Sequence, residues 1–194
     1  FDASLAFNPK STLIAYSRKG GITNNIVAPV GGEGLFAGQT FAANLSGDFN
    51  SIVAKQNAVL VYLGAESKGS RAQKLQALDH KFADIQEKLD KKADKDEKPA
   101  KKLKRDEKVI KALLSGDKPL LAYADRATDL LALLALKEKY SLDLVLVSAS
   151  DAVLVADKIA AANVPVIISS IDNLPSSFDS LHGSLSNRAT LVAA

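Results

Sequence analysis

Residues 118–170 alternate between short apolar runs and longer amphipathic segments. The apolar runs show no polar alternation, which is typical of strands buried on both faces of a parallel sheet. The order strand, helix, strand, helix, strand is the pattern of consecutive βαβ units. We therefore predict strands at residues 120–123, 144–147 and 164–168, with helices at residues 126–140 and 151–162.

The sequence before residue 118 predicts a second set of elements. Residues 70–89 are predicted to form a helix because apolar residues recur at spacings of three and four, giving one stripe of Leu75, Leu78, Phe82, Ile85 and Leu89. Ser11 is a suitable N-cap for a helix that runs through residue 18. The remaining predictions are a strand at 22–29, a hairpin-like excursion at 35–45, a strand at 58–63, and short helices at 109–114 and from 187 onward.

Two architectures fit consecutive βαβ units. Because crossovers between parallel strands are right-handed, the sheet belongs either to a (β/α) barrel or to a doubly wound domain. We expect an α/β fold in which residues 1–194 form a single segment of a larger (β/α)8 TIM barrel, with mostly parallel strands and flanking helices. The alternative is a small, self-contained doubly wound α/β domain with a ligand loop at residues 148–151.

The net charge of +3 conceals one strongly basic segment. Residues 88–111 hold eleven Lys or Arg and six Asp or Glu, so this segment carries +5 and the rest of the chain −2. The stretch at about 90–105 has almost no apolar residues and contains Pro99, which predicts a charged surface insertion. Interleaved acidic residues and the lack of aromatic side chains for base stacking argue against nucleic-acid binding.

Residue types that are rare or missing narrow the chemistry. The chain has no Cys, which excludes disulfides and thiol catalysis, and its two His are too few for a His-rich metal centre. His80 lies off the apolar stripe of its helix and is interpreted as a solvated residue. No apolar run is long enough to span a membrane, so we expect a soluble protein without a membrane partner.

The ends of the sequence lead to one further expectation. The chain begins at Phe1, contains no Met and stops within a helical pattern. We expect a piece of a longer protein or a chain from which a leader was removed. In the second case a periplasmic or secreted location follows.

Polar residues follow each predicted strand of the 118–170 region at its carboxyl end. The carboxyl ends of parallel strands meet at one edge of a sheet, where barrel and doubly wound enzymes place their active sites. The candidates to face a substrate are Tyr123, Asp125, Arg126, Ser148, Asp172 and Asn173.

Structural roles are the competing interpretation of this set. Asp125 is placed to cap the helix that starts at Arg126, and Ser150 is placed to cap the helix that starts at Asp151. Arg126 and Asp129 have the spacing of a pair on a helix surface. The pattern alone leaves both interpretations open.

Several phrases stand in an order and spacing that is moderately specific for one enzyme family. They are YSRKGGIT at 16–23, GLFAGQ at 34–39, PLLAYADRATD at 119–129, VPVII at 164–168 and NLPSSFD at 173–179. Together they resemble the middle of the imidazolonepropionase-like branch of the amidohydrolase superfamily. The resemblance covers most of the chain apart from residues 88–111.

The resemblance implies a (β/α) barrel hydrolase that acts on non-peptide C–N bonds with one or two divalent metals, often zinc. In such sites the metal makes hydroxide available near neutral pH and polarises the scissile carbonyl. The family's ligands lie at the carboxyl ends of the barrel strands. The implied partners of this segment are the remainder of the barrel and a small-molecule substrate.

The sequence departs from the family pattern at the metal ligands. The family's His-x-His pair and its late Asp-bearing strand are both absent from the chain, and Tyr123 and Ser148 stand where His residues are expected. A phenol is a poor zinc ligand at neutral pH because it is normally protonated. We therefore expect no tightly bound metal and no activity in the isolated segment. Its open sheet edges predict self-association. A non-catalytic relative that binds a small molecule or a protein partner is the alternative.

Overall fold

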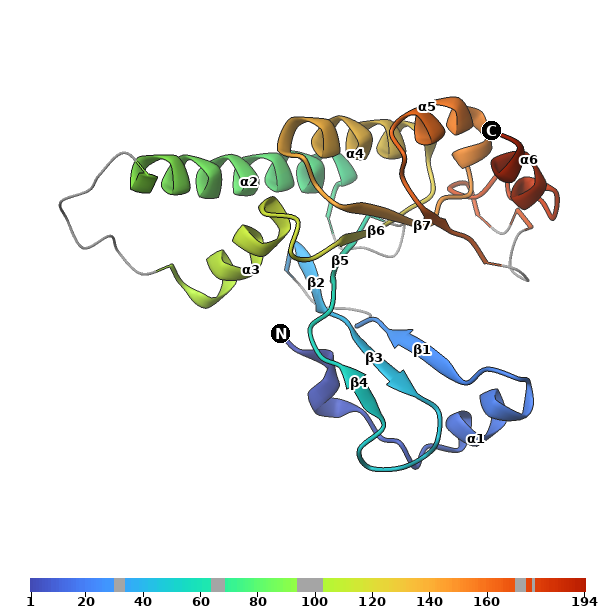
Figure 1. Cartoon of the computed structure of the whole chain (residues 1–194). Helices are drawn as coiled ribbons and strands as arrows, with labels where there is room; N and C mark the ends of the chain where they lie inside the picture. Colours follow the sequence, from blue (N-terminus) through green and yellow to red (C-terminus); the bar gives the residue numbers. More distant parts are fainter. Residues whose placement is uncertain (30–33, 64–68, 94–102, 170–173, 176) are drawn as a thin grey trace. The chain divides into compact units, whose positions relative to one another are not determined.

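The computed structural model describes residues 1–29, 34–63, 69–93, 103–169, 174–175 and 177–194 (Figure 1). The chain divides into two compact units, Phe1–Val61 and Tyr62–Ala194. Most of the predicted charged insertion lies outside the described residues. At its start, however, the preceding helix continues to Ala93.

The first unit is built from short antiparallel strands. Three of them form a sheet in the order β1-β3-β4, and β2 pairs with β5. Its elements are η1 (Ala3–Ala6), α1 (Thr12–Lys19), β1 (Asn24–Val27), β2 (Phe36–Gln39), β3 (Phe41–Asn44), β4 (Ile52–Ala54) and β5 (Val59–Tyr62). The predicted cap of α1 is confirmed, since Ser11 Oγ accepts a hydrogen bond from the Leu13 amide and Gly20 follows the last helical residue.

The hairpin predicted at residues 35–45 is wrong. β2 and β3 are separated by Thr40 alone, whereas a hairpin turn needs at least two loop residues. Thr40 instead donates its amide to the Ala58 carbonyl and accepts a hydrogen bond from the Asn57 amide. The chain therefore passes from one pair of strands into another at this residue. β4 was not predicted, because its three residues carry no alternation to mark a strand.

The second unit contains a parallel sheet with flanking helices. β6, β7 and β8 are neighbours in chain order, and Leu120–Ala124 pairs in parallel with Leu144–Ser148 without a register shift. The elements are α2 (Arg71–Ala93), α3 (Arg105–Leu114), β6 (Leu120–Ala124), α4 (Ala127–Tyr140), β7 (Leu144–Ser148), η2 (Ala152–Val155), α5 (Ala156–Ala161), β8 (Val166–Ile167) and α6 (Asn187–Ala193). The mixed α/β class with a parallel sheet is confirmed.

Two predicted elements of this unit need correction. The strand expected at 164–168 shrinks to two residues, because the Val164 amide bonds to the Ile159 carbonyl and Pro165 has no amide to donate. The helix expected at 151–162 divides into η2 and α5. The division falls at Val155, whose φ of −135° lies outside the helical region.

The core of the second unit lies between the sheet and its helices. Figure 1 shows α2 and α4 on the same side of β6 and β7, and alternate strand residues on the buried side are at most 1% exposed, namely Leu120, Ala122, Ala124, Leu144 and Leu146. The predicted stripe of α2 is confirmed, since Leu78, Phe82 and Ile85 are buried. His80 is exposed, as predicted. Among the described residues, no helix combines the length and apolar composition needed to cross a membrane.

Asp79 connects α2 to α4, and this connection should depend on pH. Its carboxylate accepts hydrogen bonds from Lys139 Nζ at 2.6 Å and from the Tyr140 hydroxyl at 2.7 Å. These two hydrogen bonds lower the pKa of Asp79 below its ordinary value, and the bond from Lys139 contributes more than the bond from Tyr140. The ionised form therefore stabilises the folded state at neutral pH, and this stabilisation is lost as the pH falls through the lowered pKa.

We expect Asp79→Asn to lower the free energy of unfolding by about 0.5–1 kcal/mol at neutral pH, a small value because both partners are partly exposed. The loss should shrink as the pH falls below about 4, where Asp79 of the unfolded wild-type chain becomes protonated, and it should vanish below the lowered pKa of the folded state. Urea unfolding of both proteins at neutral and acidic pH measures this difference. Asp84→Asn on the exposed face of α2 is the matched control. An equal loss at both pH values would contradict an ionic contribution from Asp79.

Candidate functional site

Three predicted polar residues meet at the carboxyl ends of β6 and β7. Asp125 Oδ1 accepts hydrogen bonds from Ser148 Oγ at 2.6 Å, Ser150 Oγ at 2.8 Å and the Ser150 amide at 3.2 Å. All three residues are half-buried. We call Asp125, Ser148 and Ser150 the carboxyl-end cluster. Sheet topology alone predicted this meeting, because both strands end at the same edge.

The backbone after β7 turns sharply to form this cluster. Ser148 and Ala149 have φ values of 72° and 50°, in the left-handed region that costs a non-glycine residue about 1–2 kcal/mol. Two backbone bonds hold the turn: the Ala149 amide donates to the Ala124 carbonyl, and the Asp151 amide donates to the Asp125 carbonyl, each at 2.9 Å. The loop therefore wraps around the end of β6.

The caps predicted for the two following helices are wrong. Asp125 and Ser150 bond to each other across the sheet edge and do not cap their own helices. The first amide of α4, on Ala127, instead donates to Asp151 Oδ2 at 3.1 Å. A carboxylate from the neighbouring strand's loop thus satisfies the exposed helix amide, where its charge is also favoured by the helix dipole.

Asp151 has a second partner on its other oxygen. Oδ1 lies 2.8 Å from Nδ1 of His182. The Asp151 side chain is 14% exposed and that of His182 is 49% exposed. Asn187, which is buried, fixes the segment by donating its Nδ2 to the carbonyls of His182 at 2.9 Å and Ser150 at 3.2 Å. His182 is therefore held beside the carboxyl-end cluster.

A group of four charged residues lies at the amino-terminal ends of α2 and α4. Arg71 contacts Asp129 at 2.9 Å through Nε and Asp179 at 3.3 Å through Nη1. Arg126 Nε pairs with the same Asp179 oxygen. Arg126 and Asp129, which were expected to pair with each other, are thus bound to Asp179 and Arg71. We call Arg71, Arg126, Asp129 and Asp179 the ionic cluster.

Burial and charge act in opposite directions on Asp129. Burial raises the pKa of its carboxyl group, while the positive charges of Arg71 and Arg126 lower it and the negative charge of Asp179 raises it further. The net direction is upward. As the pH rises above the ordinary pKa of an Asp carboxyl group, ionisation of Asp129 therefore opposes folding. This is the behaviour of a carboxylate held inside the structure, with Asp129 6% exposed.

The structure brings only some of the predicted residues together. Tyr123 does not join the cluster. It stacks on Tyr62 with ring centroids 4.4 Å apart and an interplanar angle of 16°. Asp172 and Asn173 lie outside the described residues. The predictions missed Asp151 as a partner, together with His182 and Arg71. These residues are far apart in sequence and show no periodic pattern that would link them.

The described residues do not fit a metal site. They contain no group of three or more His, Asp or Glu side chains placed to hold an ion. The donor chemistry agrees, because Asp125 Oδ1 already accepts three hydrogen bonds and both serine hydroxyls point their protons toward it. At the end of β6, Tyr123 is engaged with another ring. The described residues therefore do not provide a ligand set for the divalent metal that the family resemblance implies.

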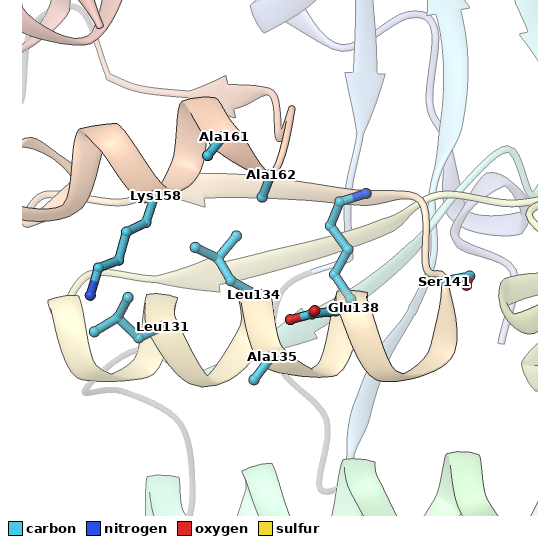
Figure 2. Close-up of a pocket in the computed structure, with 9 residues that line it drawn as sticks. Leu131, Leu134, Ala135, Glu138, Ser141, Lys158, Ala161 and Ala162 are labelled. Carbon is cyan, nitrogen blue, oxygen red and sulfur yellow. The ribbon is translucent and has the colours of Figure 1, made fainter.

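Two hollows lie away from the cluster. A groove of about 800 Å³ lies between α4 and α5. Figure 2 shows Leu131, Leu134 and Lys158 pointing into it. It involves the carboxyl-terminal half of α4 and therefore lies toward the amino ends of the strands. A smaller apolar hollow of about 320 Å³ is lined by residues of α5, β8 and α6, including Ile159, Val166 and Val192.

Comparison with known proteins gives a likeness in fold. No protein-family model matches the chain, and no curated protein matches it in sequence. Among solved structures, the chain is similar to the crystal structure of an amidohydrolase from Thermotoga maritima, with a TM-score of 0.85 and 19% sequence identity over 96% of this chain. The match spans 52% of the length of that protein. The chain thus shares its fold with about half of that protein.

Proposed function

We propose that this chain is a segment of an amidohydrolase-like barrel hydrolase that acts on non-peptide C–N bonds. The observation that carries the proposal is the arrangement of β6, β7 and β8 as neighbours in chain order, with the polar residues that follow β6 and β7 gathered at the carboxyl ends of these two strands. This arrangement, the fold likeness to an amidohydrolase and the sequence phrases point in the same direction. The imidazolonepropionase-like branch rests on the phrases alone.

The strand order favours a barrel segment over a doubly wound domain. In a doubly wound sheet the strand order reverses at a switch point, and helices cover both faces. In the described part of the second unit the order β6-β7-β8 shows no reversal. Right-handed crossovers between strands in this order place all their helices on one face, as in a barrel.

The uncovered surface of the second unit supports the same proposal. Tyr123, Val145 and Val147 project from the face opposite the helices and are only half-buried, and Ile167 beside them is 50% exposed. Parallel sheets are normally covered on both faces. β8 pairs with β7 alone among the described strands. The remainder of a barrel would cover this face and continue the sheet from β8.

Metal, substrate and location remain proposals that follow from the resemblance. A divalent metal, with zinc as the expected ion, would be held by residues of the parent protein beyond this chain, since the described residues do not fit it. The substrate would be a small molecule with an amide-like carbon. The isolated chain would then be inactive. A periplasmic or secreted location would apply if a leader was removed.

The experiment compares the 194-residue chain with a longer natural protein that contains it. Elemental analysis should find divalent metal in the longer protein and none in the 194-residue chain. A panel of cyclic and acyclic amides should be hydrolysed by the longer protein in a chelator-sensitive reaction. Stoichiometric zinc in the 194-residue chain would overturn the proposed location of the ligands. The solution mass of the short chain separately tests self-association.

A non-catalytic relative is the second candidate, and one observation favours it. Tyr123, at a position where the family carries a His, is packed against Tyr62, and Asp125 Oδ1 already accepts hydrogen bonds from both serine hydroxyls. A barrel with these substitutions would bind a small molecule or a protein partner without hydrolysing it. A longer protein that folds but neither retains metal nor hydrolyses any amide would support this candidate.

A further inference from the structure

We propose that His182 is a proton-transfer residue of this site and that Asp151 is its positioning residue. The two side chains meet at 2.8 Å between His182 Nδ1 and Asp151 Oδ1, although 31 residues separate them in sequence. Neither residue belongs to the predicted ligand set. The proposal rests on the proposed hydrolase function for its substrate class, an amide-like C–N bond, but its geometry stands without that function.

Contacts other than the one with His182 already hold Asp151 in place. Its Oδ2 accepts a hydrogen bond from the backbone amide of Ala127, the first residue of α4. The backbone amide of Asp151 donates to the Asp125 carbonyl. With the carboxylate 14% exposed and bonded on both oxygens, its rotation is restricted. An acidic side chain held in this way can orient an imidazole, as the aspartate of a catalytic triad does.

The contact with Asp151 also determines the tautomer of His182. A carboxylate oxygen only accepts hydrogen bonds, so a neutral His182 must carry its proton on Nδ1. Nε2 is then left with a free lone pair. The ring is 49% exposed, and the structure gives Nε2 no partner among the described residues. A positioned imidazole with a basic, accessible nitrogen is the arrangement that general acid–base catalysis requires.

The position of His182 fits a role at the carboxyl end of the sheet. Asn187 links the His182 carbonyl to the Ser150 carbonyl, which places the histidine next to the carboxyl-end cluster. The serine hydroxyls there donate to Asp125, so their protons are not available to His182, and the serines are not activated as nucleophiles toward a substrate. Water is therefore the reactant that the histidine would activate.

The proposed step is balanced by water alone. Nε2 of His182 takes a proton from a water molecule as its oxygen forms a bond to the amide-like carbon. The C–N bond then breaks, and the proton on Nε2 passes to the leaving nitrogen. One water molecule is consumed, and His182 returns to its starting protonation state. Asp151 keeps the ring oriented and stabilises the imidazolium in between.

The first test reads the tautomer and reactivity of both histidines in the 194-residue chain without any substrate. In ¹⁵N-labelled protein, two-bond ¹H–¹⁵N correlations should show His182 protonated on Nδ1 when neutral. His80, exposed on α2, provides an internal reference. Diethyl pyrocarbonate should modify His182 faster than His80. Asp151→Asn should abolish both differences, whereas Asp157→Asn, which removes an exposed carboxylate of α5, should leave them unchanged.

The outcomes separate this proposal from a simple tether between loops. If both histidines react equally, or if Asp151→Asn changes neither the tautomer nor the reactivity of a protein that retains its circular dichroism, the proposal is overturned. In the longer hydrolase, His182→Gln should lower kcat by about 100-fold with little change in KM. Asp151→Asn should lower kcat by up to about the same 100-fold factor, because Asp151 acts through the orientation and tautomer of His182. Hydrolysis that is insensitive to His182→Gln would overturn this inference while leaving the proposed function intact.

Discussion

Replacing Phe82 with alanine should lower the free energy of unfolding of the second unit by about 3–5 kcal/mol. Phe82 is fully buried on α2, and its ring lies 5.4 Å from that of Tyr140 on α4. Truncation removes the transfer free energy of the ring and leaves a cavity between two helices. Leu78 and Ile85 belong to the same stripe and are held by the rigid helix, so they can fill the space only partly.

Urea unfolding followed by far-UV circular dichroism measures this loss. Phe178→Ala is the matched control because Phe178 belongs to the same unit and is 86% exposed. We expect the control to change the free energy of unfolding by no more than about 0.5 kcal/mol. A loss of less than about 1 kcal/mol for Phe82→Ala would mean that α2 does not pack on α4 as described.

The elements that the sequence predicted well are those defined by local patterns. The stripe through Leu78, Phe82 and Ile85 has helical spacing, and α2 buries this stripe. The apolar runs at β6 and β7 have no alternation because the sheet lies under helices on one face and carries apolar residues on the other. Repeated side-chain burial leaves a trace in the sequence, which is why these elements could be predicted.

The elements that were missed depend on single residues or on distant partners. Thr40 alone separates β2 from β3. One residue is too short for a hairpin turn, so each strand pairs with other strands. Pro165 shortens β8 by removing one backbone donor. Each changes the hydrogen bonds of its neighbours without changing the apolar pattern.

Only the part of the candidate site that follows from sheet topology could be predicted from the sequence. The meeting of Asp125 with Ser148 follows from two parallel strands that end at one edge, and the structure has it. The helix caps were predicted from adjacent residues, but the nearest polar group in space came from the neighbouring loop. Asp151 caps α4 and contacts His182, and neither role has a local signal.

Asp125→Ala should lower the free energy of unfolding by about 2–3 kcal/mol, since unsatisfied partly buried donors cost about 1–3 kcal/mol each and water can reach part of this site. The change removes the acceptor of Ser148 Oγ, Ser150 Oγ and the Ser150 amide together. It also releases one restraint on a loop with two left-handed residues, Ser148 and Ala149.

Asp125→Asn separates the hydrogen bonds from the charge at this site. The asparagine oxygen can still accept from the serines, so we expect a smaller loss of about 1 kcal/mol. Asp143→Ala is the positional control, because Asp143 is exposed at the amino end of β7 and its backbone carbonyl, which bonds to the Leu120 amide, is retained. Urea unfolding of the four proteins gives the ranking. If Asp125→Ala costs no more than Asp143→Ala, Asp125 is not holding the loop. Its carboxylate would then be available for a ligand, as a substrate-facing role requires.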